Sequence, residues 1–510
     1  MTPARFAVRS LAWAAAPWLL AGCTMGPNFQ RPAPWWSPAR FTAPAAPAVA
    51  SQTVATPIDP HWWTLLGDPL LTSLEGRLDA GNLDLRVATL RLAEARAQLG
   101  VSRAALYPGV NGNASYLRQE ASRKGVLALA TAGTPGTGAN GTGGRGATPN
   151  TSLFKPYDLY QAGFDASWEV DLWGRVARSV ESARAQVSAS ADSRRDTMVT
   201  ASAELARDYV DLRGAQRKLD ITRQNLDIAK QNLQLTQARA AGGITTDLDV
   251  ANAAAEMQTV AAQIPLLEAR AASLMNAIAF LLGAPPHALE GELATARAVP
   301  PVPPLVPVGV PSDLLRRRPD IRRAEAQLHA ATADIGVAVA DFYPRFVLAG
   351  SGSLQSVQFH SLGDWAATAF SFGPSVSLPI FEGGRLTRTL ELRKAQQQEA
   401  AITYQRTVLA ALHEVDDALT AYRTEQQRRA RLEAAVVQNR RALALARDRY
   451  AQGVADFLQV LTVQRALLAA EQDLADSTTA VSTDLVALYK ALGGGWNEAA
   501  PVAAPGPAKA

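Results

Sequence analysis

The longest uninterrupted helical pattern in this chain of 510 residues runs from Arg385 to Gln452, 68 residues without a glycine or a proline. At about 1.5 Å per residue, one continuous helix of that length would extend roughly 100 Å. Compact domains do not contain helices this long, whereas extended helical hairpins and coiled coils do. After Gly453 the chain again lacks both residues as far as Leu492. The sequence therefore predicts two long helices joined by a short turn.

The same order of features occurs twice in the chain. Three pairs of segments correspond: 82–108 with 318–344, DLWGRVARS (171–179) with FEGGRLTRT (381–389), and RAAGGITTDLDV (239–250) with RYAQGVADFLQV (449–460). Their shared points are Tyr-Pro, Gly-Arg and Arg-x-x-x-Gly, and chance similarity between alanine-rich helices would not keep these in one order. The first copy carries a Gly/Thr-rich insert at 131–150, and Gly214 and Pro265 interrupt its helical pattern. We therefore expect an internal two-fold repeat.

Each copy opens with a helical pattern, at 83–106 and at 313–342, that ends at Tyr-Pro because the residue before a proline avoids the helical region. Four segments with a period of two then follow: 110–118, 159–170, 346–355 and 370–380. About ten tilted residues suffice for a strand that crosses a membrane. Aromatic residues at the segment ends are typical of an interfacial girdle: Tyr107, Trp168, Trp173, Phe342, Tyr343 and Phe381. An ordinary sheet with one wet face is the alternative.

Four strands cannot close a membrane barrel by themselves. In lipid, each unpaired backbone group at a strand edge costs several kcal/mol. If these strands lie in a membrane, several chains must share one barrel. Bacterial barrels usually have even strand counts from 8 upward, and three chains would supply 12. Long helices attached to such a barrel would continue it as a tube.

The only cysteine, Cys23, follows an export-like leader. Arg5 and Arg9 precede an apolar run at 11–21, which is too short to span a bilayer and indicates a cleavable signal over 1–22. Leu-Ala-Gly-Cys resembles the bacterial lipobox, which implies a covalent diacylglycerol and an N-acyl chain, such as palmitate, on Cys23. Thr24 is not the aspartate that retains many lipoproteins at the inner membrane, so we expect the outer membrane. A chance buried thiol is the alternative.

Charge and residue spacing argue against several other functions. The net charge is +4, and two arginines leave with the signal, so nucleic acid is not an expected partner. The five histidines are scattered without metal-ligand spacing, and no catalytic or metal site is expected. No later stretch of 18 apolar residues occurs, and we expect no transmembrane helix.

The chain resembles the TolC-like outer-membrane efflux factors, specifically their NodT/OprM-type lipoprotein subgroup that serves resistance–nodulation–division pumps. The resemblance rests on Cys23 with GPNFQRP (26–32), HWWTLLGDPLL (61–71), NLDLRVA (82–88), HEVDDAL (413–419), RYAQGVADFLQVLTVQRALLAAEQDL (449–474) and the paired Tyr-Pro and Gly-Arg sites. It implies an α+β membrane protein, a trimer with a 12-strand outer-membrane barrel and a periplasmic α-helical barrel about 100 Å long. The implied function is passive conduction, as in multidrug resistance, from a periplasmic adaptor and an inner-membrane pump to the exterior.

The resemblance also implies a periplasmic gate and adaptor contacts at the two hairpin turns, Ala241–Asp249 and Gln452–Gln459. The gate candidates are Asp247, Asp249 and Asp456 with Arg239 and Arg449, and the adaptor-contact candidates are Gly242, Gly243 and Gly453. Helix capping is the alternative role of the aspartates. Many relatives carry an aspartate where this chain has Thr462, so a second acidic ring is not implied.

The expected boundaries follow this order. They are a signal at 1–22, an acylated N-terminal segment and equatorial part at 23–80, a first repeat at 81–282 (β-hairpin 108–173, helical hairpin 174–282), a Pro-rich connector at 283–312, a second repeat at 313–492 (β-hairpin 344–383, helical hairpin 384–492) and a flexible tail at 493–510. Two other functions stay open. A periplasmic adaptor would have one helical hairpin, and a structural coiled-coil lipoprotein would not need the alternating strands.

Overall fold

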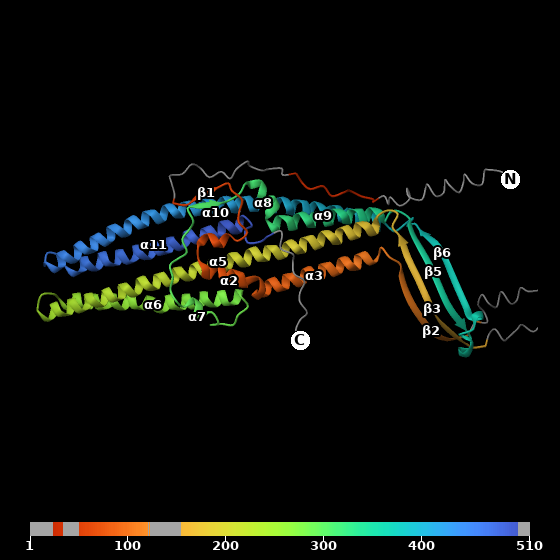
Figure 1. The fold of residues 1–510 in the computed structure, drawn as a ribbon, viewed down its shortest axis with the longest axis horizontal. Coiled ribbons are helices and arrows are strands. Elements are labelled where there is room, and N and C mark those ends of the chain that lie inside the picture. Colours follow the sequence, from red (N-terminus) through yellow and green to blue (C-terminus); the bar gives the residue numbers. More distant parts are fainter. Residues whose placement is uncertain (1–23, 34–49, 121, 123–154, 498–510) are drawn as a thin grey trace, which may run out of the picture. The chain divides into compact units, whose positions relative to one another are not determined.

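The computed structural model describes residues 24–33, 50–120, 122 and 155–497 (Figure 1). The leader 1–22, Cys23 and the insert at 131–150 lie outside the described residues. The chain divides into two compact units. We call Met1–Phe29, Gln98–Ala183 and Ala331–Gln397 the strand unit, and Gln30–Ala97, Arg184–Ala330 and Gln398–Ala510 the helical unit.

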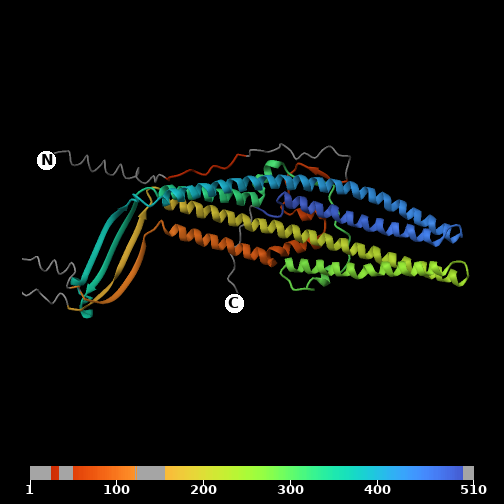
Figure 2. The same ribbon diagram turned by 180° about the vertical axis from the view of Figure 1, so that it is seen from behind.

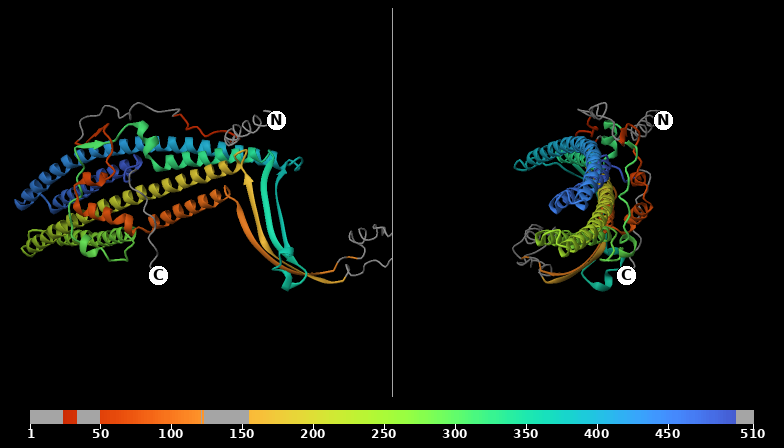
Figure 3. Two further views of the ribbon diagram at one scale, coloured as in Figure 1. Left: turned by 45° about the vertical axis from the view of Figure 1, so that its right-hand side comes forward. Right: turned by 90° about the vertical axis from the view of Figure 1, so that its left-hand side faces the viewer.

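The long helices come in pairs of equal length. Helices α3 (Leu83–Ala104) and α9 (Pro319–Ala340) have 22 residues each, α5 (Arg175–Ala241) and α10 (Arg385–Ala451) have 67 each, and α6 (Asp247–Leu281) and α11 (Phe457–Ala491) have 35 each. In the helical unit, α5 lies beside α6 and α10 beside α11, and both turns are at the same end (Figures 1 and 2). Viewed along their length, these helices follow an arc that does not close (Figure 3, right).

The two expected interruptions of the first copy are wrong, because α5 continues through Gly214 and α6 through Pro265. A Cβ at Gly214 would lie 2.4 Å from Thr479 Oγ1 on α11. Glycine therefore allows close helix packing at this position, and does not break the helix. Pro265 removes one helical hydrogen bond, at a cost of about 3 kcal/mol, and α6 nevertheless runs through it from Asp247 to Leu281.

The helix expected at 313–342 is divided in two. Helix α8 (Pro311–Arg317) ends before Arg318, which has an extended backbone (ψ 120°), and α9 begins at Pro319. A residue that precedes proline is displaced from the helical region, while proline itself is favourable in the first turn of a helix. The connector at 283–312 contains β4 (Leu305–Pro307), which pairs in parallel with β1 (Gln52–Val54).

The strand unit holds one antiparallel sheet in the order β2-β3-β5-β6 (Figure 3, left). The strands are β2 (Gly109–Gln119), β3 (Tyr157–Val170), β5 (Arg345–Ser356) and β6 (Thr368–Ser377). The last strand ends three residues before the expected residue 380. Pro379 lacks the N–H that would continue the ladder. Two short helices, η3 (Phe359–Ser361) and η4 (Trp365–Ala367), connect β5 to β6.

The main core of the helical unit gathers around short elements of the N-terminal part and the connector. These are η1 (Trp62–Leu66), α2 (Pro69–Gly81), α7 (Glu290–Leu293) and α8. Trp62 is 1% exposed and stacks on Tyr489 of α11, with ring centroids 5.2 Å apart. Leu71, Leu74 and Leu78 of α2 are fully buried in the same cluster.

Among the described residues, α6 is the one helix that is long and apolar enough to cross a membrane, by length and composition only. Its most apolar 18-residue window has a mean hydropathy of 1.3, and 22% of that window is buried. Alanines raise the average although polar residues interrupt every apolar run. Leu266 and Phe280 of this helix are 74% and 72% exposed.

Candidate functional site

The two faces of the four-stranded sheet differ in polarity. Residues with even numbers share one face in all four strands, because the register pairs even with even positions. That face carries Phe164, Trp168, Phe370, Phe372 and Val376, all of them exposed in the single chain. The opposite face carries mostly serine, asparagine, glutamine and glycine. Such alternation is the signature of a strand with lipid on one side and water on the other.

Both outer strands of the sheet, β2 and β6, have one unpaired edge within the described chain. A two-edged sheet with an apolar face cannot lie in lipid alone, because its edge N–H and C=O groups have no water to bind. The Trp168 indole lies near the end of β3 and donates to the carbonyl of Leu106 at 3.0 Å. It thus combines an apolar ring with a satisfied polar atom, as interfacial aromatics do.

The residues that follow the expected lipid site are held in a defined way. Met25 N donates to Trp173 O at 3.0 Å. Arg178 of α5, with a side chain 4% exposed, donates from Nε to Met25 O at 3.2 Å and from Nη2 to Asn28 Oδ1 at 2.5 Å. Glu181 neutralises this arginine through Oε2, 2.7 Å from Nη1. Residues 24–29, which we call the anchor segment, are therefore docked on the strand unit although Cys23 itself lies outside the described residues.

The gate candidates at the first hairpin turn serve as helix-end residues in this structure. Gly243 adopts a left-handed conformation (φ 70°), as the reversal after α5 requires. Thr246 caps α6, and its hydroxyl and the Asp249 carboxylate form a reciprocal capping box. The Thr245 hydroxyl donates to Asp249 Oδ2 at 2.5 Å and lowers the pKa of that carboxyl. Asp247 is an exposed residue of the first turn.

The second turn is built in the same way. Gly453 has φ 75°, and Asp456 caps α11 by accepting from Gln459 N at 3.1 Å. Asp456 matches Thr246 of the first copy, so both copies cap the returning helix at the same position. Thr462 is exposed and its hydroxyl donates to the Leu458 carbonyl within its own helix.

The two candidate arginines, which match each other in the repeat, have different surroundings. Arg239 lies over the ring of Tyr450, with its guanidinium carbon 4.3 Å from the ring centroid, and donates from Nη1 to Tyr450 O at 3.0 Å. Tyr450 is buried and packs against Phe457 at a centroid distance of 5.7 Å. Arg239 thereby joins the first hairpin to the second. Arg449 is exposed.

Sequence reasoning missed four exposed aliphatic residues beside the turn glycines. Ile244 and Leu248 of the first turn are each 69% exposed, and Val454 and Leu458 of the second are 63% and 56% exposed. They occupy matching positions of the two copies. The sequence does indicate this exposure, because an apolar residue directly after each Arg-x-x-x-Gly lies in a short turn, where no hydrophobic core can cover it. Gly242 is also exposed, next to Gly243.

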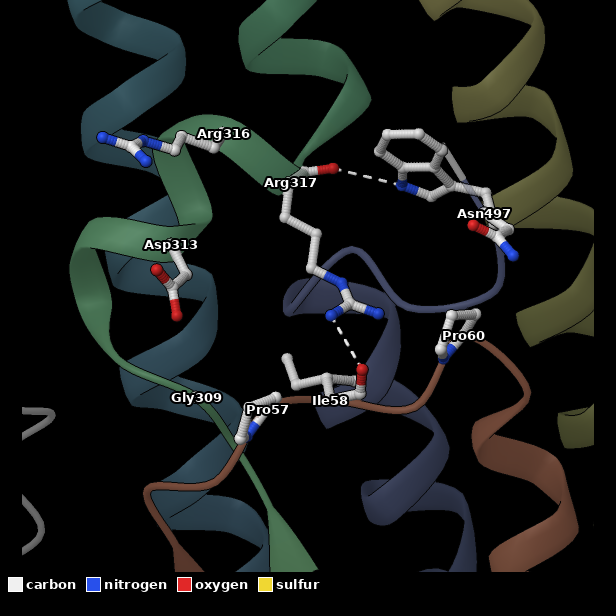
Figure 4. Close-up of a pocket in the computed structure, with 9 residues that line it drawn as sticks. Pro57, Ile58, Pro60, Gly309, Asp313, Arg316, Arg317 and Asn497 are labelled. Carbon is white, nitrogen blue, oxygen red and sulfur yellow. Dashed lines mark hydrogen bonds between the residues drawn. The ribbon is translucent and has the colours of Figure 1, made fainter. Parts of the chain in front are cut away.

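A cavity of about 320 Å³ lies in the helical unit between α8, the segment before η1 and the segment after α11 (Figure 4). The Arg317 side chain points into it and donates to the Ile58 carbonyl at 2.8 Å, while Trp496 Nε1 donates to the Arg317 carbonyl at 3.1 Å. The Trp496 ring also lies under the guanidinium groups of Arg195 and Arg322. Residues 493–497 of the expected flexible tail thus make specific contacts, and 498–510 lie outside the described residues.

Within the described ranges, no group of three or more His, Cys, Asp or Glu residues is placed to hold a metal ion. The geometry instead consists of a sheet with one lipid-compatible face, helix pairs of 67 and 35 residues, and a docked anchor segment. These features are those expected of an outer-membrane channel protein.

Comparison with known proteins agrees with this class. The family model of the outer membrane efflux proteins matches residues 76–284 and 310–494, and the chain belongs to that family. It is 33% identical over 484 residues to outer membrane protein OprJ of Pseudomonas aeruginosa, covering 94% of both chains. It is 30% identical to the probable outer membrane lipoprotein SilC of Salmonella typhimurium, covering 94% of this chain and 97% of SilC. The structure of the outer-membrane channel OprN superimposes with a TM-score of 0.83 at 34% identity, covering 93% of this chain and all of that one. This protein is therefore an outer-membrane efflux channel component that extends into the periplasm, as expected from the resemblance.

Proposed function

We propose that three copies of this chain form one conduit, in which their sheets close a 12-strand barrel and their duplicated helices form a periplasmic tube. The observation that carries the proposal is the sheet with an apolar face and two unpaired edges, β2 and β6. Pairing β2 of one copy with β6 of the next satisfies both edges without any new element. Twelve strands agree with the even strand counts of bacterial barrels.

The helical unit supports the same assembly. Its long helices follow an arc, and Leu266 and Phe280 of α6 are largely exposed in one chain. Apolar side chains at these positions gain about 25 cal/mol for each Å² that a neighbouring copy covers. The equal lengths of the paired helices support a duplication, so that each copy contributes two similar hairpins to the tube.

We also propose that the acyl chains of Cys23 insert beside the barrel. The anchor segment starts one residue after Cys23 and is fixed by Trp173 and Arg178, which follow the end of β3 along the chain. A lipid attached there is held next to the strand ends. Two or more acyl chains give stable membrane anchoring, whereas one gives only reversible binding.

We also propose that the two hairpin turns of the helical unit form the gate and meet the adaptor. Close to the turns, Arg239 joins the two hairpins of one copy through the ring and carbonyl of Tyr450, and the ion pair of Arg465 with Glu256 joins them further along the helices. Opening requires the hairpins to separate and hence this contact to break. Asp247, Asp249, Asp456 and Arg449 add charge around the same end, while the exposed aliphatic residues beside Gly242, Gly243 and Gly453 offer apolar contact to a periplasmic adaptor protein. The adaptor would link the conduit to an inner-membrane pump.

The barrel is tested by placing charge on each face of the sheet. Replacing both Trp168 and Phe372 with aspartate should impair membrane insertion, because a charge that faces lipid is unfavourable. Replacing Ser351 and Ser371 with aspartate adds the same charges to the polar face and should leave insertion intact. Flotation of outer-membrane fractions measures the membrane insertion of both double variants. Equal insertion of the two double variants would overturn the assignment of faces.

A further inference from the structure

One row of side chains crosses all four strands on the polar face. Asn111, Asp165, Ser351 and Ser371 are direct cross-strand partners in the register, one from each strand. Asn111 Nδ2 donates to Asp165 Oδ2 at 3.2 Å, and Asn113 Nδ2 donates to Oδ1 of the same carboxylate. The two serine hydroxyls are 2.8 Å apart. Two amides therefore hold one carboxylate in a fixed orientation among neutral groups.

Asp165 differs from the other charged residues of this face. Within the four described strands, the polar face carries charge at Asp165, Glu169 and Arg345. Glu169 lies 2.7 Å from Arg175, and Arg345 lies 3.0 Å from Asp341, so both are compensated by an ion pair. The partners of Asp165 are the amides of two asparagines, which orient the carboxylate without neutralising it.

We propose that Asp165 sets the charge preference of the strand section, so that cations and cationic substrates pass this level more readily than anions. The inference rests on the proposed assembly, in which the polar faces of three sheets line one pore and bring three Asp165 carboxylates to one height. Rings of carboxylates favour cations in water-filled pores. The Debye length is about 8 Å at physiological ionic strength and about 30 Å at 0.01 M. The preference is therefore strongest in dilute salt.

The experiment uses a thiol introduced into the same row. Ser351 lies opposite Asp165 and is exposed, so Ser351→Cys places a reactive thiol beside that carboxylate. Cys23 is the only native cysteine, and the unsubstituted chain gives the background labelling. Cells or proteoliposomes are treated from the barrel side with 2-(trimethylammonium)ethyl methanethiosulfonate or with 2-sulfonatoethyl methanethiosulfonate. The ratio of the two reaction rates reports the local potential and does not depend on the state of the periplasmic end.

The matched control lies on the same strand. Asp158 belongs to the opposite, apolar face, beside Tyr116 and Arg118. In the Ser351→Cys chain, Asp165→Asn should lower the cation-to-anion rate ratio roughly threefold in dilute salt and less at high salt. Asp158→Asn should leave the ratio unchanged.

Three outcomes contradict parts of this account and can be told apart. A rate ratio that is insensitive to Asp165→Asn, with Ser351→Cys reactive, overturns the role of Asp165 and leaves the conduit intact. A ratio that changes with Asp158→Asn instead reverses the assignment of faces. No reaction of Ser351→Cys with either reagent, in a chain that inserts normally, overturns the water-filled lumen and with it the proposed assembly.

Discussion

Gly26 of the anchor segment and Gly336 of α9 meet backbone to backbone: a Cβ on Gly26 would lie 2.6 Å from the Cα of Gly336. Gly26 also has φ 88°, which a residue with a side chain rarely adopts. The anchor segment thus reaches its Arg178 contacts only because both positions lack a side chain.

Gly336→Ala should therefore release the anchor segment. Its Cβ would lie 2.8 Å from Arg178 Cγ and 2.9 Å from Met25 O, and overpacking of this kind costs about 1–3 kcal/mol. The Met25 amide, which donates to Trp173 O, should then exchange its hydrogen about tenfold faster or more. Gly100→Ala is the matched control, because Gly100 occupies the equivalent position of the first copy and nothing lies within 4 Å of its Cβ. Unchanged exchange in Gly336→Ala would show that the close approach does not hold the segment.

Arg239→Ala should open the periplasmic end. The substitution removes the cation–π contact and the hydrogen bond of Arg239 with Tyr450, which join the two hairpins close to their turns, together on the order of 1–3 kcal/mol. Single-channel conductance in planar bilayers should rise severalfold. Arg449→Ala changes the matching arginine of the second copy, which is exposed, and should leave conductance near that of the unchanged channel. If the two variants have the same conductance, the contact of Arg239 with Tyr450 does not hold the periplasmic end closed.

Asp456 separates the capping and gating roles. Asparagine caps a helix as well as aspartate does, whereas alanine costs about 0.5–2 kcal/mol. A purely capping Asp456 predicts that Asp456→Asn leaves conductance and cation selectivity unchanged and that Asp456→Ala lowers the thermal stability of the turn. If the negative charge of Asp456 takes part in gating, Asp456→Asn should change the conductance, although asparagine still caps the helix. From its contact with Gln459 N, we expect the capping result. Measurements of conductance and of thermal unfolding on both variants distinguish the capping role from the gating role.

Glu75 makes the stability of the helical unit depend on pH. It is 3% exposed in α2, and burial raises the pKa of its carboxyl to about 8 from 4.5. A raised carboxyl pKa means that the folded protein holds the proton longer than the unfolded chain. The unit is therefore most stable below about pH 4.5 with respect to this group and loses stability as the pH rises to about 8. The loss is on the order of 5 kcal/mol, since one pKa unit corresponds to about 1.4 kcal/mol.

Glu75→Gln should remove most of this dependence. Denaturant unfolding at pH 5 and pH 8 should show a large difference for the unchanged chain and a small one for the variant. An equally steep loss in the variant would assign the pH dependence to other groups.

The sequence was sufficient for features that depend on local periodicity. The 67 residues of α10 agree with a run of 68 residues without glycine or proline. The strand at Tyr157–Val170 was visible from Phe164 and Trp168, because alternation repeats every two residues. Breaks within helices were less predictable. Gly214 suggests an interruption by propensity, and only its contact with Thr479, far away in the sequence, explains why a glycine belongs there.

Contacts between distant residues could not be predicted from one sequence. Arg239 and Tyr450 are 211 positions apart, and nothing in either neighbourhood indicates the other. The matching Arg449 has the same local motif and a different environment, because Ala240 stands where the second copy has Tyr450. Similarly, Glu75 falls in a helical pattern that does not distinguish a buried carboxylate from an exposed one.

In the proposed assembly, one chain cannot seal a pore and three together can. Native mass spectrometry of the full-length lipoprotein, released from detergent micelles, counts the chains in each particle. The account predicts a single species with three chains, which closes the β2 and β6 edges of every copy. Particles of one chain that retain the sheet signal in infrared spectra would contradict it.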